Sequence, residues 1–463
     1  MAAGRWADTE EDHAAEEKSR KDKEDKKRKR AEKAQKKAEE EAARRHDEEA
    51  AAARAAAEHE NGADTPNKRR KISPPAEQSE ASEPHSRKLL RFPQSQWSPS
   101  RHVSNFERLN HIEEGSYGWV SRAREIGTGE LVALKKLKME ANETTGFPVT
   151  GLREIQCLME ARHKHIVDLR EIVVGDGFDD VYLVMDFLEH DLKTLQEEMQ
   201  EPFVPSEIKT LLTQLTGAVG FLHDHWILHR DLKTSNILMN NRGEIKLADF
   251  GMARYFGDPC PQMTQLVVTL WYRAPELLLG EERYGRPVDL WSIGCIFGEL
   301  LTKAPLLQGK NEVDQLSKIF ELCGVPTDET WPGFKRLPNA KSLRLPRTQQ
   351  NVGAVIRAKF PLLTNAGADL LSSLLALNPA RRPSAQEVLS HPYFGENPRP
   401  KSSAMFPTFP SKAGQEKRRR FASPSAPKRG DAPKITGEAA DFSSIFATRD
   451  EEESGGGFQL KLI

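Results

Sequence analysis

The sequence predicts an α+β fold for the middle of the chain, and two observations support this class. Residues 106–394 consist of apolar runs broken by turn signals, whereas both flanks are rich in charged or small residues. Within this stretch strand-like segments come first, at residues 106–112 and 131–135, and an amphipathic helical pattern follows around residues 152–159. We therefore expect one folded region over residues 106–394.

The composition of the whole chain excludes several classes of protein. The 463 residues are 37% hydrophobic and 30% charged, against roughly 45–50% and 25% in ordinary globular domains, so part of the chain buries no core. The four cysteines, at positions 157, 260, 295 and 323, have neither disulfide-framework nor zinc-ligand spacing, which favours a reducing compartment. No apolar run approaches the roughly 18 residues of a membrane-spanning helix. Residues 1–12 are acidic, unlike a signal sequence. Secreted disulfide-rich and membrane-spanning proteins are therefore excluded.

Residues 1–100 are expected to form a charged arm of low complexity. From Ala7 to Lys71 there is no Val, Ile, Leu, Phe, Met, Tyr, Trp or Cys, so this segment cannot bury enough apolar surface to fold as a globule. Charges of both signs spaced four residues apart favour a solvated single helix or a disordered arm. The alternative is a nucleic-acid arm, but acidic residues interleave throughout, so direct nucleic-acid binding is not expected.

Two short basic clusters lie in the flanks. Residues 67–71 read Asn-Lys-Arg-Arg-Lys and residues 417–420 read Lys-Arg-Arg-Arg, and a Ser-Pro pair follows each, at Ser73 and Ser423. Such clusters suit a nuclear import signal or a weak phosphate contact, and the alternative is a solvated run of charge. We expect a nuclear protein that is also found in the cytoplasm, with a largely disordered tail over residues 397–463.

The first strands of the folded region surround a glycine-containing turn. Residues 106–112, 113–120 and 131–135 form three strands, joined by this turn and by a Gly-Thr-Gly hairpin at residues 127–129. Gly115 and Gly118 would let backbone N–H groups approach phosphate oxygens. Alone this signal is weak, but Lys135 would place a cation under the turn and Glu154, in the helical pattern, could pair with it.

Residues that suit phosphoryl transfer follow in a fixed order. The run 229–236 reads His-Arg-Asp-Leu-Lys-Thr-Ser-Asn, and after a strand at residues 244–248 come Asp-Phe-Gly at 249–251 and Ala-Pro-Glu at 274–276. Phosphoryl transfer needs a carboxylate that orients the acceptor hydroxyl, oxygen ligands for magnesium, and fixed cations. These requirements are met by Asp231, Asn236, Asp249, Lys135 and Lys233.

Together these motifs resemble the protein kinase family over residues 106–394. The resemblance implies a bilobal α+β fold, with a small antiparallel sheet and one key helix in residues 106–185 and a larger, mostly helical lobe in residues 189–394. It implies ATP and Mg2+ as cofactors. It assigns Asp231 as catalytic base, Lys233 to the γ-phosphate, Asn236 and Asp249 as Mg2+ ligands, and Lys135, paired with Glu154, to the α- and β-phosphates. Glu276 would pair with Arg382 to brace the large lobe.

The resemblance also implies a nucleotide-binding surface. Its residues would be Ile112, Gly115, Gly118, Val120, Ala133, Lys135, Met185, Asp186, Leu188, Asp191 and Leu238. Several of these side chains would equally serve as core. One departure is Glu113, which stands where the family has the first glycine of its phosphate loop. Because every charged catalytic position is filled, we expect altered nucleotide affinity, not an inactive pseudokinase.

Residues 148–154, Pro-Val-Thr-Gly-Leu-Arg-Glu, resemble the signature helix of cyclin-dependent kinases, most closely the PITSLRE class. Gly151 departs from that signature and weakens the start of the helix by up to ~1 kcal/mol, which a partner that clamps the helix would offset. The resemblance implies a cyclin partner of the L type, and roles in cell-cycle control, transcription and pre-mRNA splicing. A mitogen-activated kinase is the alternative enzyme, but it would carry Tyr where this chain has Leu266.

Regulation and substrate choice follow from the same resemblance. Phosphorylation of Thr264 would activate the enzyme, with the phosphate held by Arg153, Arg230 and Arg254. Ser116 and Tyr117 match inhibitory sites of the family, or are ordinary loop residues.

The residue at Val268 would adopt a left-handed backbone held by Arg273, which favours protein substrates with Ser-Pro or Thr-Pro sites, splicing and transcription factors among them. A scaffold that binds a cyclin and splicing factors, and a nucleic-acid binder acting through the basic clusters, are the alternatives from other classes.

Overall fold

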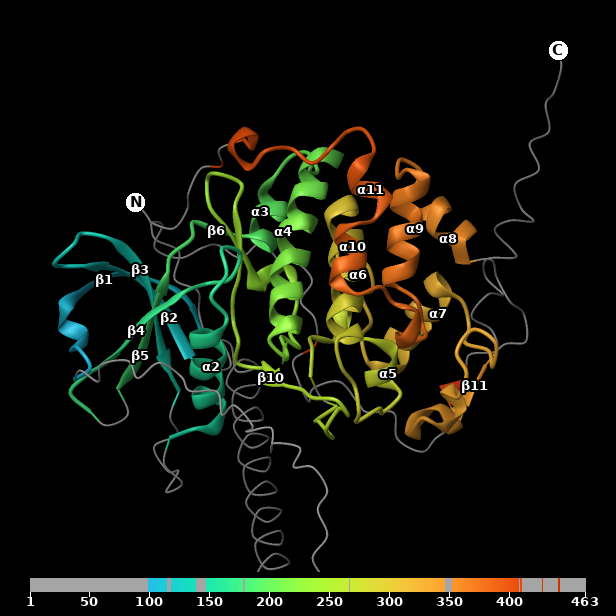
Figure 1. The fold of residues 1–463 in the computed structure, drawn as a ribbon, viewed down its shortest axis with the longest axis horizontal. Helices are drawn as coiled ribbons and strands as arrows, with labels where there is room; N and C mark the ends of the chain where they lie inside the picture. Colours follow the sequence, from blue (N-terminus) through green and yellow to red (C-terminus); the bar gives the residue numbers. More distant parts are fainter. Residues whose placement is uncertain are drawn as a thin grey trace, which may run out of the picture. The chain divides into compact units, whose positions relative to one another are not determined.

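The computed structural model describes residues 99–114, 118–138, 147–177, 180–265, 267–345, 352–407 and 409, with 427 and 440–441. These residues lie in one compact unit, Gln94–Ile463. They form a two-lobed α+β fold, with an antiparallel sheet and one helix in the first lobe and mostly helices in the second (Figure 1). The predicted fold class is therefore confirmed.

The sheet of the small lobe has five antiparallel strands in the order β1-β2-β3-β5-β4. The strands are β1 (Phe106–Glu114), β2 (Gly118–Glu125), β3 (Leu131–Leu137), β4 (Leu169–Val174) and β5 (Val181–Asp186). The three predicted strands are confirmed as β1, β2 and β3, with different bounds. β1 and β3 extend beyond the predicted ends at residues 112 and 135, and β2 is displaced from the predicted residues 113–120 to Gly118–Glu125. A bulge-like register shift between His111 and Glu113 bends β1 just before its end.

Alternation of side chains along β3 positions the first charged residue of the site. Val132 and Leu134 face a small apolar cluster with Phe106 on one side of the sheet. Because neighbouring side chains of a strand point to opposite faces, Ala133 and Lys135 face the other side. There Lys135 meets helix α2 (Val149–Glu160), the α-helix in the described part of the small lobe.

Helix α2 has apolar side chains on two faces. Its buried residues are Gly151, Glu154, Cys157 and Leu158. Leu152 and Met159, which the sequence pattern places on one apolar stripe with Leu158, are instead more than half exposed, as is Val149. The helix therefore packs on the sheet through one face and presents apolar side chains to solvent on another.

The large lobe is built from helices with short strand pairs between them. Its helices are α3 (Leu192–Glu198), α4 (Pro205–Asp224), α5 (Pro275–Leu278), α6 (Pro287–Thr302), α7 (Glu312–Cys323), α8 (Val352–Lys359), α9 (Asn365–Leu374), α10 (Ala385–Leu389) and α11 (Pro392–Gly395). Its short strands are β6 (His190–Asp191), β7 (Ile227–Leu228), β8 (Ile237–Met239), β9 (Ile245–Leu247), β10 (Arg254–Tyr255) and β11 (Leu343–Arg344), which pairs with β12 (Ala440–Asp441). The strand predicted at residues 244–248 is confirmed as β9.

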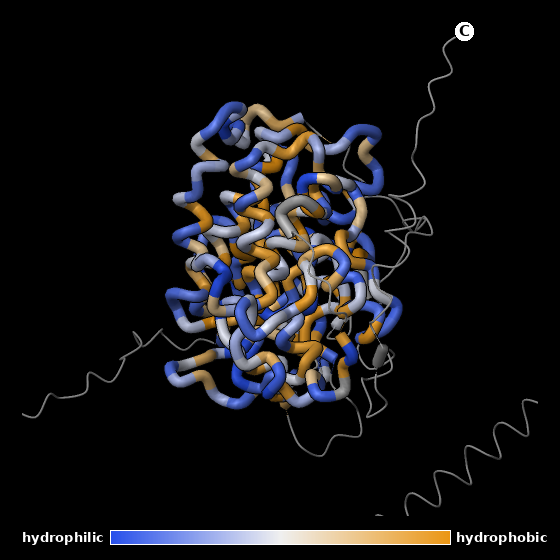
Figure 2. Tube along the Cα trace, turned by 90° about the vertical axis from the view of Figure 1, so that its right-hand side faces the viewer, coloured by the Kyte–Doolittle hydropathy of each residue, from blue (hydrophilic) through white to orange (hydrophobic). Residues whose placement is uncertain are grey.

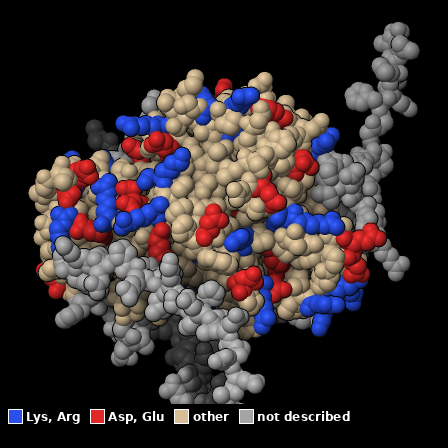
Figure 3. Space-filling view, viewed as in Figure 1, with Lys and Arg blue, Asp and Glu red and all other residues tan. Residues whose placement is uncertain are grey.

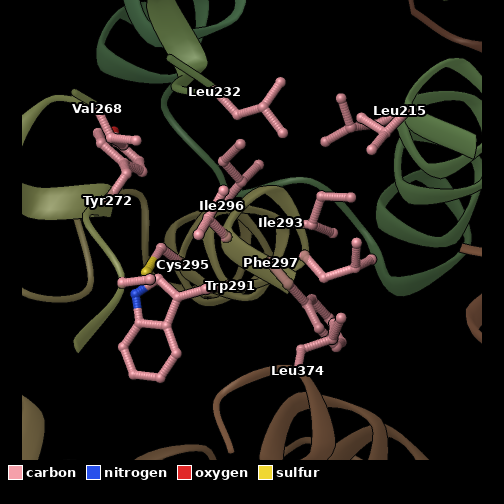
Figure 4. Packing of buried hydrophobic residues seen from close by; sticks show 14 of the residues in the cluster. Leu215, Leu232, Val268, Tyr272, Trp291, Ile293, Cys295, Ile296, Phe297 and Leu374 are labelled. Atoms are coloured by element: carbon pink, nitrogen blue, oxygen red, sulfur yellow. The ribbon is translucent and has the colours of Figure 1, made fainter. Parts of the chain in front are cut away.

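The core of the large lobe surrounds α6. This helix is apolar on nearly all sides, as expected for a helix enclosed by protein. In Figure 4, Trp291, Ile293 and Phe297 of α6 pack among residues from other elements, including Leu215 of α4 and Leu374 of α9. Along the whole tube, apolar segments gather inside and polar ones outside (Figure 2). All four cysteines are free thiols.

On the outer surface of the small lobe, basic and acidic side chains interleave (Figure 3). Arg101, for example, pairs with Glu125 at 2.6 Å and also with Glu171. None of the helices in the described ranges has both the length and the apolar character needed to cross a membrane.

Candidate active site

Three charged residues from separate elements meet at the centre of the predicted site. The Lys135 ammonium of β3 lies 2.6 Å from Glu154 Oε1 of α2 and 3.0 Å from Asp249 Oδ1, which follows β9. The Lys135 and Glu154 side chains are only 7% and 2% exposed, whereas the Asp249 side chain is 34% exposed. The predicted pair therefore forms, and its lysine is shared with a second carboxylate that is open to one side.

Burial and charge act on this cluster in opposite directions. Burial favours the neutral form of Lys135, but the carboxylates of Asp249 and Glu154 outweigh it and raise the pKa of the ammonium. Burial likewise raises the pKa of Glu154, against the pull of Lys135. For Asp249 burial would raise the pKa, but the Lys135 ammonium dominates and lowers it. Asp249 is thus held as a carboxylate beside a fixed cation.

Both carboxylate oxygens of Asp231 are held by neighbours. Oδ2 accepts from Lys233 Nζ at 2.7 Å and from Asn236 Nδ2 at 3.2 Å. Oδ1 accepts from the backbone N–H of Thr269 at 3.1 Å and from its hydroxyl at 2.9 Å. Asp231 is thereby fixed between its own loop and the segment that follows Val268.

A buried carboxylate of α6 holds the loop that carries Asp231. Asp289 Oδ2 accepts from the backbone N–H of His229 and Oδ1 from that of Arg230, at 3.1 and 3.0 Å. His223 Nε2 lies 2.9 Å from the same carboxylate. Arg230 and Asp249 both have φ near +60°, a left-handed conformation that non-glycine residues adopt at some cost. Such strain, held in place by surrounding contacts, is typical of functional sites.

This arrangement suits transfer of a phosphoryl group. Asp231 is oriented to accept a hydrogen bond from a hydroxyl. Lys233, bound to Asp231, and Lys135, bound to the open Asp249 carboxylate, provide fixed positive charge. Such preorganised charge stabilises the charge that develops on a transferring phosphoryl group.

Comparisons with known proteins agree with this chemistry. The profile of the protein kinase domain family matches residues 106–394. Serine/threonine-protein kinase ppk23 of Schizosaccharomyces pombe is 56% identical over 314 residues, which are 68% of this chain and 78% of the yeast protein. Cyclin-dependent kinase 11B of Rattus norvegicus is 50% identical over 331 residues, which are 71% of this chain and 75% of the rat protein. The chain belongs to the cyclin-dependent kinase family.

This kinase is a serine/threonine protein kinase, close to the PITSLRE class as its motifs predict. Human cyclin-dependent kinase 11B is 48% identical over 371 residues, which are 78% of this chain but 46% of the human protein. The kinase thus spans about half the length of that relative.

A protein kinase domain uses ATP as phosphoryl donor, usually with Mg2+, and the two predicted metal ligands fit that ion. Asn236 donates through Nδ2 to the backbone oxygen of Asp231 at 2.9 Å, which orients its amide. Its side-chain oxygen and the Asp249 carboxylate are the hard oxygen donors that Mg2+ takes together with phosphate oxygens and water. In the described part of the chain no cluster of three or more His, Cys, Asp or Glu could hold a metal.

The predicted nucleotide-binding residues lie on both lobes. Ala133 pairs with Met185 between β3 and β5, and Leu238 of β8 pairs with Asp191 of β6. The Asp186 carboxylate binds Lys246 and Arg170, at 2.6 and 3.2 Å, so this residue would offer a nucleotide only its backbone. Asp191 caps α3 by accepting from the backbone N–H of Thr194 at 2.8 Å.

The packing of the sheet requires glycine at position 118, which the sequence did not reveal. A Cβ atom at this position would lie 2.2 Å from the backbone oxygen of Lys136 in β3. The glycine is therefore needed for the close approach of β2 to β3, in addition to any phosphate contact. Gly115, Ser116 and Tyr117 lie outside the described residues. Ile112 and Val120 lie on β1 and β2 on either side of that turn.

The surroundings of Thr264 contain two of the three predicted arginines. The Arg230 guanidinium donates to Tyr284 Oη at 2.8 Å, and Tyr284 donates in turn to the backbone oxygen of Thr264 at 2.6 Å. Burial raises the pKa of Tyr284, against the nearby charges of Arg230 and Arg254. Arg153 lies exposed on α2. The Thr264 side chain is exposed.

The predicted conformation of Val268 is confirmed. Its φ is 63°, and its carbonyl accepts from Arg273 Nη2 at 3.0 Å and Nε at 3.3 Å. The brace between Glu276 and Arg382 is confirmed as well, with N–O distances of 2.6 and 2.7 Å.

Three residues that position the site were missed from the sequence. Thr269 holds Asp231, Asp289 holds the catalytic loop, and Tyr284 joins Arg230 to Thr264. Thr269 and Asp289 lie inside motifs that the resemblance already covers, but no periodicity or spacing marks them. Only the folded chain brings them to residues far away in the sequence.

Proposed function

We propose that this kinase, bound to a cyclin of the L type, transfers the γ-phosphate of ATP to serine or threonine residues followed by proline. The process would serve cell-cycle control, transcription and pre-mRNA splicing in the nucleus, with protein substrates that include splicing and transcription factors. The names of the cyclin-dependent kinase relatives and the two basic clusters support the partner and the location.

The left-handed Val268 carries the proposal of proline specificity. Its carbonyl is taken up by Arg273 and is therefore not available to a bound peptide. The residue after the acceptor would leave its N–H unpaired, which costs about 1–3 kcal/mol when the group is buried. Proline has no N–H and avoids this cost.

The residues of the site divide the chemistry among them. Asp231, fixed by Thr269 and Asn236, accepts the proton of the substrate hydroxyl. Lys233 and Lys135 neutralise phosphate charge, and Asn236 with Asp249 would hold Mg2+, which would supply further positive charge to the transferring phosphoryl group. The Lys135–Glu154 pair keeps the cation directed at the nucleotide.

A cyclin would cover the exposed apolar face of α2. Val149, Leu152 and Met159 are more than half exposed on the helix that carries Glu154. A partner on this face would stabilise the inward position of the helix, in which Glu154 reaches Lys135.

The test is phosphate transfer from labelled Mg-ATP to matched peptides, with and without an L-type cyclin. The peptides differ only after the acceptor serine, which is followed by proline, alanine or N-methylalanine. We expect kcat/KM for proline to exceed that for alanine by about tenfold or more, and N-methylalanine to recover much of the difference, because it also lacks the N–H.

The control for this test is Asp231→Asn, which should abolish transfer to every peptide in the presence of cyclin. Equal rates for proline and alanine peptides would refute the proline preference. Transfer that does not respond to cyclin would refute the partner.

Phosphorylation of Thr264 is the proposed activating step. Thr264→Ala should lower the activity of the cyclin-bound kinase by about tenfold or more, because no phosphate can then engage Arg230 and Arg254. Nucleotide affinity, measured with a fluorescent ATP analogue, should change little. Equal activity of mutant and wild-type kinase in the presence of cyclin would contradict this step.

A further inference from the structure

Residues 396–407 and 409, which we call the tail segment, lie against the large lobe beyond the end of the matched kinase domain at residue 394. The sequence predicts a largely disordered tail from residue 397. In the structure the chain instead turns back from α11 and runs across the top of the large lobe toward α3 and β6 (Figure 1).

The tail segment is attached to the start of α4 by hydrogen bonds and ion pairs. Lys401 donates its N–H to Ser206 O at 3.1 Å and accepts through its carbonyl from Thr210 Oγ1 at 2.6 Å. Its ammonium lies 3.0 Å from Glu207 Oε1. The buried ammonium of Lys209 donates to Glu396 O at 3.0 Å. Contacts of both backbone and side chains thus fix the first half of the segment.

Phe406 fixes the turn between β8 and β9. Its side chain is buried, at 7% exposure, and occupies the space above Gly243. A Cβ atom on Gly243 would lie 2.4 Å from Phe406 Cγ, and Gly243 has a φ of +71°, so both the ring and the turn need glycine here. Gln214 of α4 binds the same turn, donating to Gly243 O at 3.0 Å.

Phe409 contacts the strand that leads into the nucleotide site. Its ring centroid lies 6.1 Å from that of His190 and 6.5 Å from that of Phe203. His190 is buried, and its Nε2 lies 2.9 Å from Asn241 Oδ1 of the β8–β9 turn. The next residue of β6 is Asp191, which pairs with Leu238. The end of the tail segment therefore packs behind two residues proposed to bind the nucleotide.

We propose that the tail segment is part of the support of the nucleotide site, with Phe406 and Phe409 as positioning residues. Phe406 holds the β8–β9 turn and Phe409 holds β6, so that Asp191 and Leu238 keep the places in which they contact ATP. This inference rests on the proposed nucleotide site. It extends the functional domain to residue 409.

The test compares Phe409→Ala with Met405→Ala in the full-length kinase bound to cyclin. Met405 belongs to the same segment but is 66% exposed, so its removal should change neither KM nor stability. Phe409→Ala should raise KM for ATP roughly three- to tenfold, the range expected for the loss of one aromatic contact. KM for the peptide and kcat should stay within about twofold of wild type, and Phe409→Tyr should restore KM for ATP.

Phe406→Ala should raise KM for ATP as well and also lower the melting temperature, because it removes a buried ring. An unchanged KM for ATP in Phe409→Ala, or equal changes in Phe409→Ala and Met405→Ala, would overturn the inference. If the wild-type kinase shows no phosphate transfer, the proposed function fails. A titration with a fluorescent ATP analogue then still decides the inference, because the same variants should differ in nucleotide affinity.

Discussion

The two lobes each contain a buried ion pair, and the two pairs are built differently. In the large lobe, Arg382 binds both oxygens of Glu276 and also donates to the backbone oxygens of Ala376 and Pro287. Its guanidinium also lies over the Trp291 ring. In the small lobe, the Lys135 ammonium binds one oxygen of Glu154 and one of the partly exposed Asp249.

The difference between the pairs separates a structural role from a functional one. The Arg382 and Glu276 side chains are only 0% and 3% exposed, so the two charges meet inside the fold and neither faces the open site. Lys135 shares its charge with a carboxylate at the open side of the site, where a nucleotide and Mg2+ can compete for it. A buried pair of the first kind should govern stability, and a pair of the second kind should govern catalysis.

Breaking the Arg382 pair should have the largest effect on stability. Arg382→Ala leaves the Glu276 carboxylate buried without its cation, which costs about 3–5 kcal/mol of unfolding free energy. Urea denaturation followed by tryptophan fluorescence measures this. The matched control is the neighbouring Arg381→Ala, because Arg381 is exposed and should change the unfolding free energy by less than about 0.5 kcal/mol. Similar losses in both variants would contradict a structural role of the pair.

Breaking the Lys135 pair should affect activity far more than stability can explain. Lys135→Met should lower kcat/KM by about 100-fold or more, as loss of one preorganised cation does. It also leaves Glu154 buried and unpaired, so some stability is lost.

The double variant Lys135→Met with Glu154→Leu separates these two effects. Replacing both charges by apolar groups should recover the unfolding free energy lost in the single variant, while activity stays absent. Thermal unfolding and phosphate transfer measure the two quantities on the same samples. Recovery of activity in the double variant would contradict the catalytic role of Lys135.

The sequence predicted both pairs: the pair of Lys135 and Glu154 from the order of its motifs and from the resemblance, and the pair of Glu276 and Arg382 through the resemblance alone. The charged residues of the site stand in motifs of fixed order, and their positions in the fold agree with those motifs. The two exposed apolar residues of α2, Leu152 and Met159, were not foreseen, because helical periodicity places them on a stripe with the buried Leu158. A sequence pattern shows which residues are apolar. It does not show which of two apolar faces meets the protein's own core.

The tail segment was missed for a related reason. Its composition is that of a linker, rich in Pro and Ser, and its large apolar side chains are the exposed Met405 and the two rings of Phe406 and Phe409. The Phe406 ring packs where Gly243 has no side chain, and the Phe409 ring packs against the His190 ring. Both partners lie more than 150 residues earlier in the sequence. Such long-range complementarity leaves no periodic signal in either segment.

A third buried carboxylate, Glu299, sharpens the comparison because its hydrogen-bond partners are hydroxyl groups. It accepts from Thr234 Oγ1 at 2.8 Å and from Tyr272 Oη at 2.7 Å. Burial raises its pKa from 4.5 to about 6, although both hydroxyls oppose the shift. Glu276, by contrast, is bound through both carboxylate oxygens by the Arg382 guanidinium.

Of the effects predicted for Arg382, Lys135 and Glu299, that of Glu299 is the smallest, and its raised pKa makes this effect depend on pH. Below pH 4.5, which is the pKa of Glu299 in the unfolded chain, the carboxyl is protonated in both the folded and the unfolded protein, and its contribution to stability is fully present. Between pH 4.5 and about 6 the unfolded chain loses this proton while the folded protein keeps it, and above about pH 6 the folded protein loses it too. Across this range the unfolding free energy falls by about 2 kcal/mol. Glu299→Gln should remove this fall.

Other carboxylates also titrate in this range, so the informative quantity is the difference between wild-type and Glu299→Gln unfolding free energies across pH. Urea denaturation at about pH 4 and about pH 7.5 should show the variant gaining roughly 2 kcal/mol relative to wild type as the pH rises. Glu321→Gln, which changes an exposed glutamate of α7, serves as the matched control. A difference that stays constant with pH would mean that Thr234 and Tyr272 stabilise the Glu299 carboxylate enough to offset its burial.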